Sequence, residues 1–231
     1  MGQMHYLPLS APFFAFLVGA FLVVLALIQI GILRYAYLRI GISSGWAMFL
    51  LLGSLIGSYI NIPIAQLPER DVQSDAVVSF FGMQYVVPTV VEWPGTVIAV
   101  NVGGAVIPGL LSLYLLFKNE TWVSGVIATA IVAAVIHMLA YPVEGVGIAV
   151  PVFVPPVVTA LVALLIAREH AAALAYVAGS LGTLIGADLL NLDAVRGLGA
   201  PVASIGGAGT FDGIFLTGIM AVLLASFSRR A

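Results

Sequence analysis

Two aspartates in the C-terminal part of the chain are the residues best suited to chemistry. Asp212 lies in the glycine-rich segment 205–216, at or just inside the start of the last long apolar run, and Asp188 lies near the end of the preceding run. A carboxylate at membrane depth is costly, so it indicates a functional site. Two such carboxylates on consecutive helices could share a proton and activate water, or could together bind a cation. The structural alternative is that Asp212 caps its helix and Asp188 is solvated at the interface.

Other oxygen-bearing side chains are predicted on the same side of the membrane. Glu144 lies in a segment with Gly and Pro on both sides, which favours an irregular backbone, and Asn61, Asn101 and Asn191 are expected nearby. Such a cluster suits hard cations or protons, and solvated loop residues are the alternative. The three histidines are widely scattered and show no metal-ligand spacing, so neither a metal site nor a cofactor is predicted.

Glycine-rich segments open two of the apolar runs. Gly103 and Gly104 stand near the start of one run, and Gly206, Gly207 and Gly209 stand near the start of the last. Glycine lets backbones approach closely and lets a helix unwind. Interrupted helices at matching places in two halves of a chain indicate a binding site in transporters. Tight helix packing without a binding site is the alternative.

The composition is that of an integral membrane protein in one transmembrane domain, residues 1–231. Of the 231 residues, 62% are hydrophobic and only 8% are charged, whereas soluble domains carry about 25% charged residues. The chain has no cysteine, which excludes disulfides, thiol chemistry and iron–sulfur ligation. Its net charge of −2 gives no indication of a nucleic-acid partner. The lipid bilayer is therefore the one partner that composition predicts, and a homo-oligomer stays open.

We expect an all-α membrane protein with about seven transmembrane helices, because seven apolar runs reach the roughly 17–25 residues that a bilayer requires. They lie near 12–33, 45–62, 94–117, 122–141, 151–167, 171–190 and 207–227. Between the second and third runs, the 66–93 loop has β-branched and aromatic segments on both sides of Gly82, which predicts a short outer β-hairpin.

The basic residues predict the orientation in the cell membrane. With seven crossings, six of the eight fall on one side and only Arg70 and Arg196 on the other; the six are Arg34, Arg39, Lys118, Arg168, Arg229 and Arg230. Basic residues favour the cytoplasmic side. The N-terminus is therefore expected outside, the C-terminus in the cytoplasm, and the aspartates near the outer ends of their helices.

Two pairs of segments indicate an internal repeat. Residues 52–61 match 181–191 with one residue inserted, and 101–109 match 204–213. The first three helices would then match the last three in parallel orientation, with the fourth as connector. Compositional similarity of glycine-rich helices is the alternative.

Segments 57–64, 101–108, 186–191 and 209–215 together resemble a prokaryotic family of small polytopic membrane proteins, a domain of unknown function. That resemblance implies a fold relationship but no activity. Residues 188 and 212 are also weakly similar to the aspartate positions of the presenilin and signal-peptide-peptidase type of intramembrane aspartyl protease. The resemblance implies that Asp188 and Asp212 would be the catalytic pair. Ala187 and Phe211 depart from that family's motifs.

Three functions follow as expectations. The aspartate pair favours an intramembrane aspartyl protease that cuts a transmembrane peptide. The repeat, the broken helices and the acidic cluster favour a transporter or a protein that binds small cations or protons. The third alternative is a membrane scaffold that binds a partner through its outer hairpin.

Overall fold

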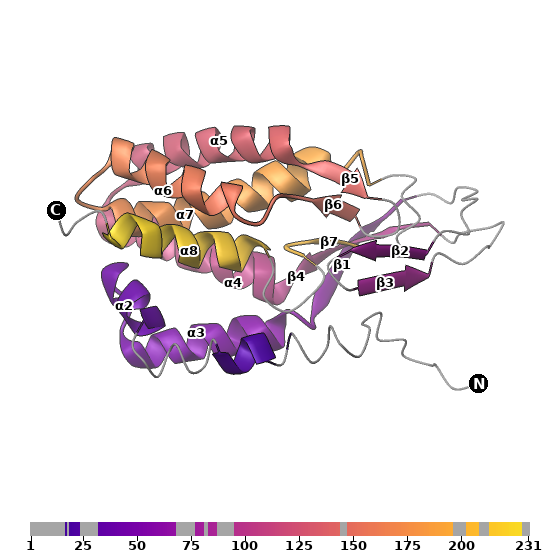
Figure 1. The fold of residues 1–231 in the computed structure, drawn as a ribbon, viewed down its shortest axis with the longest axis horizontal. Coiled ribbons are helices and arrows are strands. Elements are labelled where there is room, and N and C mark those ends of the chain that lie inside the picture. Colours follow the sequence, from indigo (N-terminus) through magenta and orange to yellow (C-terminus); the bar gives the residue numbers. More distant parts are fainter. Residues whose placement is uncertain are drawn as a thin grey trace.

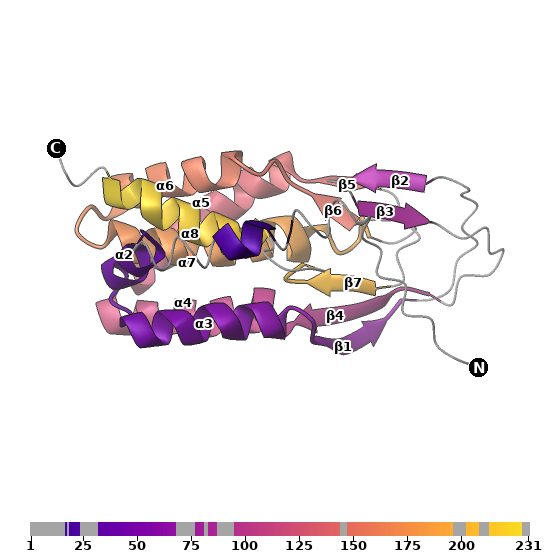
Figure 2. The same ribbon diagram turned by 60° about the horizontal axis from the view of Figure 1, so that its bottom comes forward.

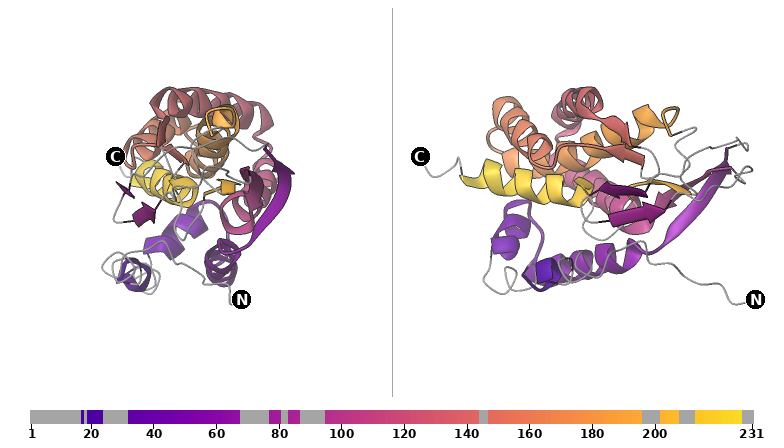
Figure 3. Two further views of the ribbon diagram at one scale, coloured as in Figure 1. Left: turned by 90° about the vertical axis from the view of Figure 1, so that its right-hand side faces the viewer. Right: turned by 45° about the vertical axis from the view of Figure 1, so that its right-hand side comes forward.

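The computed structural model describes residues 17, 19–23, 32–67, 77–80, 83–86, 95–143, 147–195, 202–207 and 213–227. Within these ranges the helices pack lengthwise and the strands gather at one end, which we call the strand end (Figure 1). Figure 3 shows the same separation from two further directions. The helices are α2 (Ile32–Arg39), α3 (Ser44–Gly57), α4 (Ile107–Asn119), α5 (Trp122–Leu139), α6 (Val154–Ile166), α7 (Ala171–Thr183) and α8 (Gly213–Phe227).

Short irregular helices extend two of these elements. A π-helical turn, η1 (Val102–Val106), leads into α4. A second π-helical turn, η2 (Leu184–Asp188), continues α7 and is followed by a 3-10 turn, η3 (Leu189–Asn191). With these extensions, three helices among the described residues are long and apolar enough to cross a membrane, namely Val102–Asn119, Trp122–Leu139 and Ala171–Asn191. The chain is therefore a membrane protein with a mainly helical fold.

In the part of the chain that the structure describes, three small sheets modify the all-α expectation. The largest has the order β1-β4-β7, in which β4 (Val97–Asn101) pairs antiparallel with β1 (Asn61–Gln66) and parallel with β7 (Val202–Ile205). The others are the hairpin of β2 (Val77–Phe80) and β3 (Met83–Val86), and the pair of β5 (Tyr141–Val143) and β6 (Gly147–Ala149). The β2–β3 hairpin lies where the loop sequence predicts it.

The predicted boundaries of two helices are wrong at the ends that meet the strands. The 45–62 run ends as a helix at Gly57 and continues as β1, and the 94–117 run begins as β4. Figure 2 shows β1 continuing the line of α3, and β4 leading into α4. The β-branched Val97, Ile98 and Val100 favour a strand, and β4 gains hydrogen bonds on both sides by taking that form.

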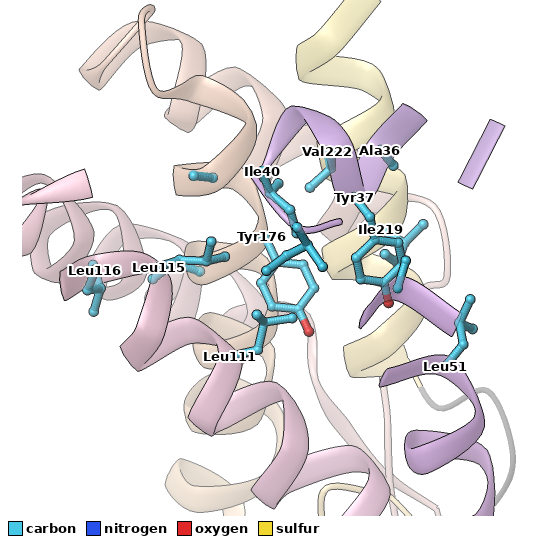
Figure 4. Close-up of a cluster of buried hydrophobic side chains, with 14 residues drawn as sticks. Ala36, Tyr37, Ile40, Leu51, Leu111, Leu115, Leu116, Tyr176, Ile219 and Val222 are labelled. Carbon is cyan, nitrogen blue, oxygen red and sulfur yellow. The ribbon is translucent and has the colours of Figure 1, made fainter. Parts of the chain in front are cut away.

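Helix α7 is the centre of the molecule, because all but two of its 13 residues are buried. One hydrophobic cluster joins it to α2, α3, α4 and α8, and a second joins it to α5, α6 and α8. Figure 4 shows the first cluster, in which Tyr37 of α2 and Tyr176 of α7 lie among aliphatic side chains such as Leu111 and Ile219. The turn η2 continues this central helix toward the strand end and ends at Asp188.

Candidate functional site

Asn101 joins the end of α3 to the start of the α4 element. It ends β4, and its Oδ1 accepts a hydrogen bond from the backbone N–H of Gly104 at 2.8 Å, which caps η1. Its Nδ2 donates to the carbonyl oxygen of Ser58 at 2.7 Å and to Oδ1 of Asn61 at 3.1 Å. The side chain is 1% exposed. Because both ends of this buried amide have protein partners, Asn101 holds the structure together rather than offering oxygen to an ion.

Ser204 connects the third strand to the same junction. Its Oγ lies 2.6 Å from Oδ1 of Asn61 and 2.6 Å from the carbonyl oxygen of Gly207. A hydroxyl has one proton, so Ser204 donates to only one of these two acceptors at a time. Oδ1 of Asn61 thus faces donors from both β4 and β7, and the amide–hydroxyl network ties the three strands at the ends nearest the helices.

Asp188 approaches this junction from α7. Its Oδ2 accepts a hydrogen bond from the backbone N–H of Gly206 at 2.7 Å. Gly206 has φ +96°, and a Cβ atom there would lie 2.6 Å from the backbone nitrogen of Ala105. Only glycine fits both that conformation and that space. The carboxylate of Asp188 is therefore held by the backbone of the segment that leads toward Asp212.

The backbones of α3 and η1 also meet without intervening side chains. A Cβ on Gly103 would lie 2.0 Å from the carbonyl oxygen of Ser54 and 2.4 Å from the nitrogen of Ser58. The predicted close approach at the glycine-rich segments is thus present, and at this position it serves packing. The same contact fixes where Asn101 meets Ser58.

Asn191 does not join this network through its amide nitrogen. Its Nδ2 donates to the carbonyl oxygens of Gly186 at 2.8 Å and Ala187 at 3.0 Å, one turn earlier in its own helix. It closes the C-terminal end of the α7 element, where backbone carbonyls lack helical partners. Of the predicted site residues, the structure brings together Asn61, Asn101, Asp188, Gly206 and Gly207.

The other predicted site residues, Glu144, Gly209 and Asp212, lie outside the described residues. Within the described ranges, no three His, Cys, Asp or Glu side chains gather where they could hold a metal ion. Ser204, Ser58 and Gly104 were not predicted as site residues. The proposed repeat could have indicated Ser204, because it aligns Ser204 with Asn101. In the structure both residues lie within hydrogen-bonding distance of Asn61.

Helix α8 packs beside α7. The two helices touch at Gly179 and Gly218, where a Cβ on Gly179 would lie 3.2 Å from the Cα of Gly218. Asp188 is nine residues after Gly179, along α7 and its extension η2, and Gly213 is five residues before Gly218 in α8. At about 1.5 Å per residue, these are about 13 Å and about 7.5 Å toward the strand end. Gly213, the residue after Asp212, thus begins its helix within roughly one turn of the level of Asp188.

Comparison with known protein families shows where the chain belongs. A family model described as "Protein of unknown function (DUF1614)" matches residues 55–224, a range that includes Asn61, Asn101, Asp188 and Ser204. No curated protein matches the chain. No solved structure matches it either.

Proposed function

We propose that this chain, which belongs to the DUF1614 family of unknown function, is a multi-pass membrane protein with a carboxylate site at the outer ends of α7 and α8. Exposed aromatic side chains support the multi-pass arrangement. Trp46 and Trp122 lie at one end of the helices, and Tyr59 and Tyr141 lie toward the other. Trp122 and Tyr141 are 19 residues apart, about 28 Å along a helix, which matches the hydrocarbon thickness of about 30 Å.

Seven crossings are part of this proposal. In this proposal the three long helices and the shorter apolar helices Ser44–Gly57, Val154–Ile166 and Thr217–Ser226 would be six of the crossings, and the 12–33 run would be the first. The basic Arg39, Lys118 and Arg168 lie at the end opposite the strands, which supports a cytoplasmic location of that end. The adjacent parallel strands β4 and β7, each followed by glycines and a helix, support the internal repeat.

The best-supported activity is that of an intramembrane aspartyl protease, with Asp188 and Asp212 as the catalytic pair. The observation that carries it is the hydrogen bond from Gly206 N–H to Asp188, because it attaches the first aspartate to the short segment that leads to the second. Five residues lie between Gly206 and Asp212 in the sequence, and α8 begins directly after Asp212 beside α7. Both carboxylates would then face one water molecule at the strand end.

The proposed roles follow from the environment of Asp188. A hydrogen bond from a backbone N–H stabilises an ionised carboxylate, so Asp188 is assigned as the base. It takes a proton from water as the water oxygen attacks the carbonyl carbon of the peptide bond. Asp212, protonated, donates a hydrogen bond to the carbonyl oxygen and stabilises the tetrahedral intermediate. Asp188 then gives the proton that it took from water to the amide nitrogen as the C–N bond breaks, which releases a carboxylic acid and an amine.

The test is cleavage of a reporter transmembrane substrate by the purified protein in liposomes. Asp188→Asn and Asp212→Asn should each reduce the rate at least about 100-fold, as expected when a general acid or base is removed. Asp193→Asn is the matched control, because Asp193 is exposed and should not affect the rate. Cleavage by either active-site variant at the wild-type rate would contradict the proposal.

A second candidate function is binding of a proton or small cation by the same pair. The π-helical turn η2, which ends at Asp188, is the observation that favours it, because such turns within helices are frequent at functional sites. In this case, ion flux into liposomes should depend on Asp188 and Asp212 while no reporter substrate is cut. Flux that is equal in wild type and in both asparagine variants would exclude the pair as an ion site.

A further inference from the structure

The Gly206–Gly207 turn is held by two side chains from different elements. Both glycines have positive φ, +96° and +81°, a conformation that costs other residues energy. Asp188 accepts the N–H of Gly206 at 2.7 Å, and Ser204 Oγ lies 2.6 Å from the carbonyl oxygen of Gly207. The N–H of Gly207 also bonds to the carbonyl oxygen of Ser204 at 3.2 Å. The orientation of the turn therefore depends on the position of Ser204.

The position of Ser204 is in turn fixed from the neighbouring strands. Asn61 Oδ1 lies 2.6 Å from its hydroxyl, and Asn61 is itself paired with Asn101 across the β1–β4 ladder. A continuous series of contacts thus runs from Asn101 through Asn61 and Ser204 to the turn, and from the turn to Asp188. Each of these hydrogen bonds lies near the end of a strand or helix. A small shift of one residue would therefore move the residue to which it is hydrogen-bonded.

We infer that Ser204 and Asn61 are positioning residues, which hold the Gly206–Gly207 turn and thereby aim the carboxylate of Asp188. When the Ser204 hydroxyl donates to Gly207, it restrains the carbonyl of the turn, and when it donates to Asn61 it restrains the strand before the turn. Neither residue takes part in the chemistry. The consequence for catalysis rests on the proposed aspartate pair, whereas the consequence for the turn does not.

The first test measures the turn directly. Hydrogen–deuterium exchange of peptides covering 202–207 should be about fivefold faster in Ser204→Val, the effect of losing one hydrogen bond of ordinary strength. Ser204→Thr keeps the hydroxyl on a side chain with the same shape as valine. The 202–207 peptides of this variant should therefore exchange at the wild-type rate. Equal exchange in Ser204→Val and wild type, or equal acceleration in both variants, would overturn the inference.

A second pair of variants keeps the test valid if Ser204→Val fails to fold. Asn61→Asp retains an acceptor for Ser204 and Asn101 and should protect the turn, whereas Asn61→Leu should accelerate exchange. If the reporter substrate is cleaved, Ser204→Val should lower kcat with KM unchanged, and Ser204→Thr should restore it; a rise in KM alone would contradict positioning. Wild-type protein that cleaves nothing would defeat the protease proposal, while the exchange rates would still decide this inference.

Discussion

At the scale of single residues, Asn101 should be the side chain on which stability depends most at the strand end. Replacing it with Leu, which has nearly the same shape, leaves the N–H of Gly104 and the carbonyl of Ser58 without partners. We expect a loss of at least about 2 kcal/mol in the free energy of unfolding, since each buried unpaired group costs about 1–3 kcal/mol. Thermal unfolding in detergent measures it. Asn119→Leu, which removes one bond at a helix end, should cost less than about 1 kcal/mol.

The sequence could predict that Asn61 and Asn101 lie near each other, because Asn61 is near the end of one apolar run and Asn101 is near the start of the next, on the same side of the membrane. It could not predict which atoms pair, since Asn101 reaches Ser58 only after α3 and η1 have packed together. Asn191 illustrates the limit. Its residue type and position fit a cation site as well as those of Asn61 and Asn101 do. In the structure, however, its amide nitrogen donates to carbonyl oxygens of its own helix.

At the scale of elements, the contact between α3 and η1 should tolerate no added atom on the η1 side. Gly103→Ala would place a Cβ 2.0 Å from the carbonyl oxygen of Ser54, so the two backbones must separate. We expect destabilisation of about 1–3 kcal/mol, as for an overpacked core. Gly53→Ala, on α3, meets only Ile107 Cδ1 at 3.5 Å and should be neutral or stabilise the helix by up to about 1 kcal/mol. Equal melting temperatures for both variants would show that the contact is not this close.

Which elements the sequence could predict depends on how local their determinants are. Helix α5 and the β2–β3 hairpin fall within a few residues of their predicted positions, because apolar run length and a Gly turn are local signals. Strand β4 was predicted as helix because Val97–Asn101 is as apolar as the helix that follows. Its β-branched residues are only a weak local signal for a strand. Its conformation is decided by pairing with β1 and β7, which are about 35 and 100 residues distant in sequence.

At the scale of the whole molecule, the two ends of the helices differ in chemistry. The end opposite the strands carries Arg39, Lys118 and Arg168, and Lys118 Nζ donates to the carbonyl oxygen of Gly41 there. The strand end carries Asp188 and the amide network instead. Between them lies a wide apolar surface with exposed side chains such as Phe49, Val126 and Leu165. A surface of this kind is stable against lipid and would aggregate in water.

The orientation of this asymmetric molecule can be measured directly, because the chain has no cysteine and any introduced thiol is unique. Ser43 and Ala65 are both exposed and lie beyond opposite ends of α3. Since basic residues favour the cytoplasmic side, we expect Ala65→Cys to react with a membrane-impermeant maleimide in intact cells. Ser43→Cys should react only after permeabilisation. The reverse pattern would invert the orientation and place the proposed aspartate site on the cytoplasmic side. Labelling of both thiols from one side would mean that α3 does not cross the bilayer.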